Sequence, residues 1–150
     1  MKILVAYDGS ASADAAVDEV IRRPWTEGSE VRIVTVIEPG IGLMSAGAGD
    51  FYVPLCESLR ATMREDAYIR IQGALKRLQG RPDLKASYDL REGDAKYALL
   101  DAIRDWKADL VIAGSHGASG IARLFLGSVC HALVTLAPCN VEVVKAPEAA

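Results

Sequence analysis

The chain has 150 residues, of which 51% are hydrophobic and 25% charged, and its formal net charge is -3. These values are typical of one ordinary globular domain, so we treat residues 1–150 as a single unit. A net acidic chain without a Lys/Arg cluster argues against nucleic acid as a partner. Its longest apolar runs fall far short of the about 20 residues that span a bilayer, which argues against insertion in a membrane.

The three cysteines, Cys56, Cys130 and Cys139, form no CxxC pair, and the chain has only two histidines. Metal sites and disulfide frameworks usually show an even number of cysteines at regular spacing. We therefore expect free thiols in a reducing compartment and a cytoplasmic protein. The N-terminal apolar run reaches Asp8 too soon for a secretory leader, and it is better interpreted as a strand.

Apolar runs and helical periodicity alternate in the first half of the chain. A strand over 3–6 ends at Tyr7-Asp8-Gly9-Ser10, a helix follows until Pro24, and 31–37 is a second strand. Residues 38–52 are a glycine-rich loop, either a functional lid or a disordered segment. A helix over 53–79 is then expected to bury one stripe: Leu55, Leu59, Met63, Ala67, Ile71, Ala74, Leu75 and Leu78.

The second half continues the alternation. Apolar and polar residues alternate over 84–91, which predicts a half-exposed strand at a sheet edge. Asp94 caps a helix that runs to Trp106, and an apolar strand follows over 110–113. The last elements are a helix over 127–137, a strand over 141–144 and a frayed tail over 146–150.

This order predicts an α/β fold with one doubly wound, five-stranded parallel sheet and helices on both of its faces. Strands 3–6 and 110–113 are the most apolar, so we expect them to be central and adjacent. Ligands of such sheets bind outside the carboxyl ends of the strands. Asp8 and Gly114 therefore belong to one predicted crevice.

The stretch 110–128, LVIAGSHGASGIARLFLGS, is the strongest functional signal in the sequence. Glycines after a buried strand and at the start of a helix can present backbone N–H groups to a phosphate. The stretch contains no lysine, and Arg123 is its one arginine, so a phosphate would be bound mainly by backbone N–H groups. The alternative is that the glycines merely end a strand and start a helix. The absence of a P-loop and of a G-x-G-x-x-G disfavours a P-loop NTPase and an NAD-binding Rossmann domain.

Three side chains near this crevice admit two interpretations each. Asp8 either bonds a ribose or base or caps the first helix, and we favour the first role because Ser10 and Ser12 offer caps. His116 lies inside the glycine turn, where we expect a solvated histidine that contributes backbone to a phosphate site, not a general base. Cys130, near a helix start, is a reactive thiol or an inert one, and most such thiols are inert.

The spacing of Gly114-x-x-Gly117, nine further residues and Gly127-Ser128 resembles the G-2x-G-9x-G-[ST] signature of ATP-binding universal stress proteins. The resemblance covers essentially the whole chain. It extends to the first strand end at 7–10, to Val36-Ile37 and to Ala137-Pro138-Cys139 before the last strand.

The resemblance implies a Rossmann-like sheet in the order 3-2-1-4-5 and bound ATP with Mg2+ or Mn2+. It does not identify the residues that bind the metal ion. It implies that adenine lies near Ala6, Asp8 and Val36 and the ribose near Asp8 and Gly114. Phosphates and metal would meet Gly117, Gly127 and Ser128. It also implies a homodimer through strand 141–145, although Asn140 and Glu142 depart from the proline and apolar residue usual in the family.

The expected function is that of an ATP-binding regulatory module of the stress response with weak or no hydrolysis. One alternative is a slow ATPase or adenylate-transferring enzyme, which is disfavoured because no lysine, catalytic acid pair or metal-ligand cluster accompanies the motif. The other alternative is an interaction module whose crevice binds no nucleotide.

Overall fold

The computed structural model describes residues 1–40, 52–117 and 126–147, and strands and helices alternate over these ranges as predicted. Most of the predicted 38–52 loop and the last residues of the predicted 146–150 tail lie outside the described residues. The elements are β1 (Lys2–Ala6), α1 (Ala11–Arg22), β2 (Glu30–Ile37), α2 (Tyr52–Leu78), β3 (Lys85–Glu92), α3 (Ala95–Trp106), β4 (Leu110–Gly114), α4 (Ser128–Leu136) and β5 (Asn140–Val144).

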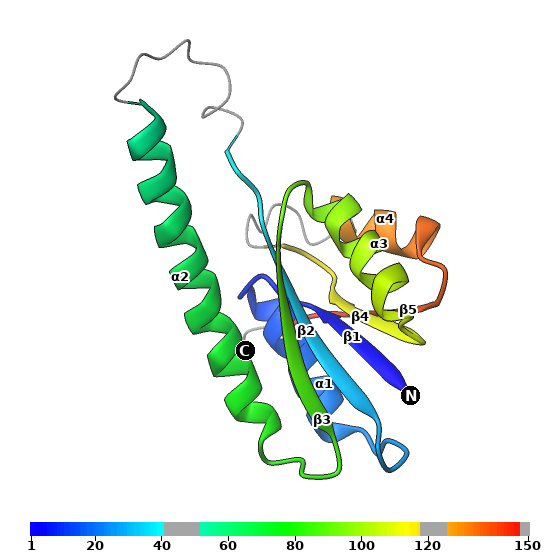
Figure 1. Ribbon diagram of the computed structural model, residues 1–150. Helices are drawn as coiled ribbons and strands as arrows, with labels where there is room; N and C mark the ends of the chain where they lie inside the picture. The colour runs from blue at the N-terminus through cyan, green and yellow to red at the C-terminus, as the bar shows by residue number, and fades with distance from the viewer. Residues whose placement is uncertain (41–51, 118–125, 148–150) are drawn as a thin grey trace.

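The five strands form one parallel sheet in the order β3-β2-β1-β4-β5, which confirms the predicted fold and strand order (Figure 1). β1 lies in the centre, where Ala6 is in register with Val34 of β2 and with Ala113 of β4. Because β1, β2 and β4 run in the same direction, the residues that follow them meet at one edge of the sheet.

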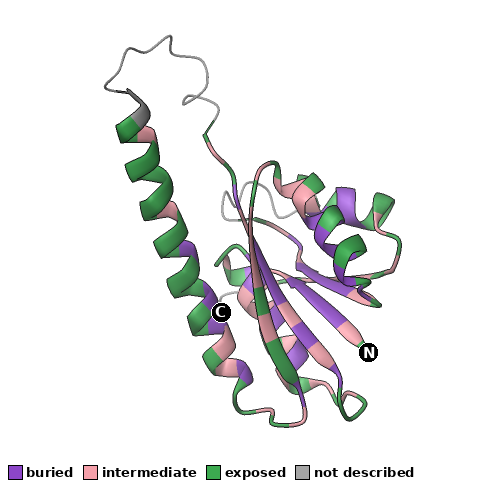
Figure 2. Cartoon of the chain, viewed as in Figure 1, coloured by how far each residue is buried: buried purple, intermediate pink, exposed green. Residues whose placement is uncertain are grey.

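Helices cover both faces of the sheet, and this explains the uniformly apolar central strands (Figure 1). Ile3 and Val5 pack with α1 and α2 in one core cluster, whereas Leu4 packs with α3 and α4 in the other. All three side chains are fully buried, and Figure 2 shows the central strand β1 as mostly buried, whereas the edge strand β3 is mostly exposed or intermediate.

The long helix α2 departs from the prediction over its first half. Ala67, Ile71, Ala74 and Leu78 are buried as expected, but Leu55 and Leu59 are 64% and 44% exposed. In Figure 1 the helix runs past the end of the sheet, so the beginning of its apolar stripe lies beyond the layer that covers the rest. Helical periodicity identifies the apolar side of a helix but does not show how far its neighbours extend.

The predicted edge strand β3 is at the edge, next to β2. The ring of Tyr88 is 44% exposed and meets Tyr68 of α2 edge to face, with 5.9 Å between ring centroids. Over the described ranges, no helix has both the length and the apolar character needed to cross a membrane.

Candidate functional site

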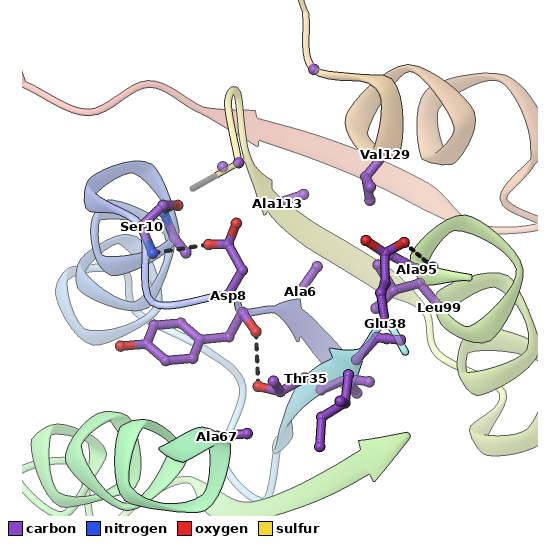
Figure 3. A pocket seen from close by; sticks show the side chains of 18 of the residues that line it. Ala6, Asp8, Ser10, Thr35, Glu38, Ala67, Ala95, Leu99, Ala113 and Val129 are labelled. Carbon is purple, nitrogen blue, oxygen red and sulfur yellow. Dashed lines mark hydrogen bonds between the residues drawn. The ribbon is translucent and has the colours of Figure 1, made fainter. Parts of the chain in front are cut away.

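A cavity of about 600 Å³ lies at the carboxyl ends of β1, β2 and β4, with further walls from α2, α3 and the start of α4 (Figure 3). Its size is within the range of small-molecule and cofactor sites. The eight residues predicted as binding residues all line it: Ala6, Asp8, Val36, Gly114, His116, Gly117, Gly127 and Ser128. The fold therefore brings the predicted residues together, and their contact with a ligand stays a prediction.

Asp8 follows β1 and is exposed toward the cavity. One carboxylate oxygen, Oδ1, accepts a hydrogen bond from Ser10 N at 2.9 Å. The other, Oδ2, would be only 3.2 Å from a Cβ atom at Gly117, so the two strand ends approach each other closely. Ser10 caps α1 by accepting from Ala13 N, which makes the alternative role of Asp8 as the cap wrong.

Gly114 is needed for packing between protein elements. A Cβ atom there would lie 2.4 Å from Ser12 Oγ, 2.6 Å from Ser12 C and 2.8 Å from Ala13 N. Two of these atoms belong to the backbone of α1 and cannot rotate away. The missing side chain thus lets the end of β4 pack directly on the first turn of α1, which fixes the start of the glycine loop.

Hydrogen bonds hold the loop after β4 on both sides. Ser12 Oγ donates to the carbonyl of His116 in a short bond, and Ser115 N donates to Val144 O at 2.8 Å. Gly127 N donates to Ser115 O at 2.9 Å and so connects the start of α4 to the end of β4. The backbone of His116 takes part in this arrangement, while its Nδ1 lies 2.8 Å from Ser115 Oγ.

Three helix N-termini border the cavity, those of α1, α3 and α4. Ser10 caps α1, and the other two differ in how they are capped. At α3, Asp94 accepts from the backbone N of Lys96 and Tyr97, and Glu38 Oε1 accepts from Ala95 N at 3.0 Å (Figure 3). At α4 the cap position is Gly127, which has no side chain, and among the residues that the structure describes no side chain caps the helix. The N-terminus of α4 is therefore the one that offers donors and partial positive charge to an anion.

Burial controls the ionisation of two cavity groups. Burial and the hydrogen bond from Tyr7 to Asp14 raise the pKa of Tyr7 to about 12, so this hydroxyl is neutral at physiological pH. Burial also raises the pKa of the Cys130 thiol. Because thiolate is the reactive form, Cys130 fits the inert interpretation better than the reactive one.

Several lining residues were not predicted from the sequence. Met63, Asp66 and Arg70 come from α2, Glu38 follows β2, and Leu99 comes from α3. Glu38 could have been found, because it follows a buried strand just as Asp8 does. The α2 residues had no local signal, since their place depends on how the long helix crosses the sheet.

Glu142, the departure noted on the last strand, is part of an ion pair inside the chain. Its two carboxylate oxygens accept from Nη1 and Nη2 of Arg23, both at 2.7 Å, and Arg23 also pairs with Glu19. The pair joins β5 to the end of α1. Separately, within the ranges that the structure describes, no three His, Cys, Asp or Glu side chains gather as potential metal ligands.

Comparison with known proteins agrees with this geometry. The model of the universal stress protein family matches residues 1–145. The chain belongs to the universal stress protein family. One relative is the universal stress protein YxiE of Bacillus subtilis, 26% identical over 146 residues that cover 96% of this chain and 98% of the relative. The solved structure of the hypothetical protein MJ0577 matches with a TM-score of 0.86 at 23% identity, covering 99% of this chain and 97% of that one.

Two further structures with the same fold contain nucleotides. A universal stress protein family protein of Arabidopsis thaliana, with AMP bound, matches with a TM-score of 0.69 at 14% identity and covers 98% of this chain and 92% of that one. A universal stress protein in complex with cAMP matches with a TM-score of 0.71 at 23% identity and covers 98% of both chains.

Proposed function

We propose that this universal stress protein binds ATP with a divalent cation and acts as a nucleotide-dependent regulatory module of the stress response. The observation that carries the proposal is the N-terminus of α4. No described side chain caps it, and it opens into a cavity lined by the motif residues Gly114, Gly117, Gly127 and Ser128. An uncapped helix start next to glycine backbone suits phosphate oxygens. The AMP and cAMP found in two proteins of the same fold support an adenine nucleotide as the ligand.

The capping of α3 indicates how the nucleotide is oriented in the cavity. Glu38 and Asp94 already occupy the first N–H groups of α3 and add negative charge there, which disfavours phosphate at that end. Apolar Val36, Met63 and Leu99 line the cavity and suit the adenine ring. We therefore place the base toward Val36, the ribose near Asp8 and the phosphates at Gly117, Gly127 and Ser128.

The residues present also fit a cation that enters with the nucleotide. Mg2+ is usually bound by one or two carboxylates together with substrate phosphates and water. Mg2+ or Mn2+ would meet the phosphates beside the Ser128 hydroxyl, and Asp8 offers a carboxylate that faces Gly117 in the same cavity. When bound, the cation neutralises phosphate charge.

The proposal includes a homodimer through residues 141–145. β5 is an edge strand, so one side of its backbone has no strand partner within the described residues. Glu142 is paired with Arg23 of α1, so its charge is compensated within one chain. Light scattering on purified protein should give twice the mass of one chain, and the mass of a single chain would contradict the homodimer.

Isothermal titration of nucleotide-stripped protein with MgATP tests the binding site. We expect saturable binding that Gly117→Val abolishes, because a side chain at this position would project toward Asp8, within 3.2 Å of its Oδ2. The control is Gly73→Val on α2, where a Cβ atom meets nothing within 4 Å. Absence of binding to the wild type at millimolar ATP contradicts the proposal. ATP turnover well above background, lost only in Gly117→Val, would favour the slow ATPase instead.

A further inference from the structure

The charge of the cavity is unusual for a site that receives a polyphosphate. Three carboxylates line it, from Asp8, Glu38 and Asp66, and Arg70 is the one Lys or Arg side chain among its described lining residues. The N-terminus of α4 supplies only about half an elementary charge. The three carboxylates repel a highly charged phosphate chain. Arg70 is therefore the described side chain that can offset this repulsion.

Arg70 reaches the cavity by crossing the turn between β1 and α1. A Cβ atom at Gly9 would lie 2.7 Å from Cδ of Arg70, so the missing side chain at Gly9 leaves room for the arginine stem. Gly9 also has φ of 78°, which favours glycine on its own account. Arg70 Nη1 donates to the carbonyl of Asp8 at 3.3 Å, which holds the guanidinium beside the turn.

The same turn touches the phosphate loop. Ser10 Oγ donates to the carbonyl of His116 at 3.4 Å, and the Asp8 carboxylate faces Gly117. Arg70 and the glycine loop thus both contact the Asp8–Ser10 turn. A guanidinium has five N–H donors, and the bond to Asp8 is the one that Arg70 makes with the described residues. The remaining donors suit a bidentate bond to a phosphate.

We propose that Arg70 is the residue that recognises phosphate charge in this cavity and makes it selective for adenosine nucleotides over uncharged adenosine. The inference rests on the proposed nucleotide site and adds a residue from α2, outside the glycine motif. In this arrangement the backbone of the motif shapes the phosphate position, the divalent cation enters with the nucleotide, and Arg70 supplies the one full positive charge that comes from the described lining residues.

The test compares adenosine, AMP and MgATP by isothermal titration on the whole, nucleotide-stripped chain. Arg70→Gln keeps a polar side chain and removes the charge. We expect it to weaken MgATP about tenfold, because one charge-assisted contact at a solvent-exposed group is lost, and to leave adenosine within about twofold. Arg70→Lys recovers part of the loss, since it restores a charge without the planar fork.

The matched control is Arg64→Gln on the same helix. Arg64 is exposed, pairs with Glu92 and does not line the cavity, so its loss leaves both affinities unchanged. The ratio of ATP to adenosine affinity is read within each variant, so a partly unfolded preparation does not alter it.

Each outcome decides the proposal. Equal losses of ATP and adenosine in Arg70→Gln would show a structural role and overturn it, as would an unchanged ATP affinity. If the wild type binds adenosine and ATP with equal affinity, the nucleotide site stands but the charge recognition fails. If the wild type binds neither, the proposed function itself fails and this inference falls with it.

Discussion

Replacement of Gly114 by alanine tests the packing between β4 and α1 most directly. The added Cβ atom would lie 2.4–2.8 Å from Ser12 Oγ, Ser12 C and Ala13 N, distances at which real Cβ atoms do not sit. Only the hydroxyl can rotate, and it would then lose its bond to His116 O. The backbone of α1 must therefore shift away from the sheet.

The expected cost follows from this overlap. Overpacking of a tight site usually destabilises a protein by about 1–3 kcal/mol. Replacing glycine by alanine offsets less than about 1 kcal/mol of this, because it lowers the conformational entropy of the unfolded chain. The φ of Gly114 is outside the positive range, so backbone strain adds nothing. We expect the free energy of unfolding to fall by about 2 kcal/mol, with a melting temperature lower by roughly 4–8 °C.

Urea unfolding followed by tryptophan fluorescence measures the change. Gly73→Ala is the control, because it adds the same methyl group on α2 with nothing within 4 Å. That substitution should stabilise the protein by up to about 1 kcal/mol through helix propensity. A Gly114→Ala protein within about 0.5 kcal/mol of the wild type would refute the packing role of Gly114.

Two further predictions concern the ionisable groups of the cavity. The wild type should lose stability between pH 10 and about 12, because unfolded Tyr7 releases its proton in this window while the folded residue keeps it. Tyr7→Phe should reduce that loss, and identical pH profiles of unfolding in urea would contradict the burial of Tyr7. In a Cys56→Ser, Cys139→Ser background, Cys130 should react slowly with a thiol reagent at pH 8, and saturating MgATP should slow it further. An unchanged rate of Cys130 labelling at saturating MgATP would show that the ligand does not bind next to Cys130.

The fold could be predicted because its signals are local. The central strands are short runs of apolar residues, and helical stripes with glycine and proline stops separate them. Once the elements alternate, the parallel sheet and its right-handed crossovers follow from general rules. The strand order came from the family resemblance, and the observed β3-β2-β1-β4-β5 order confirms it.

The eight predicted site residues come together because they occupy strand ends and a helix start. Parallel strands deliver such positions to one edge of the sheet whatever the details of packing. The sequence placed the motif glycines at the cavity, and their contact with a ligand stays a prediction. It did not indicate that Gly114 is needed for packing, because Ser12 is about a hundred residues away in the chain.

The sequence by itself therefore determined the family, the fold and the edge of the sheet that carries the glycine motif. Only the tertiary structure decided which helix N-terminus has no cap from a described side chain and which basic side chain reaches the cavity. Glu38 covers the start of α3, and Arg70 crosses the turn at Gly9. Both depend on contacts between residues that are far apart in the chain, and such contacts form only when the helices have packed on the sheet.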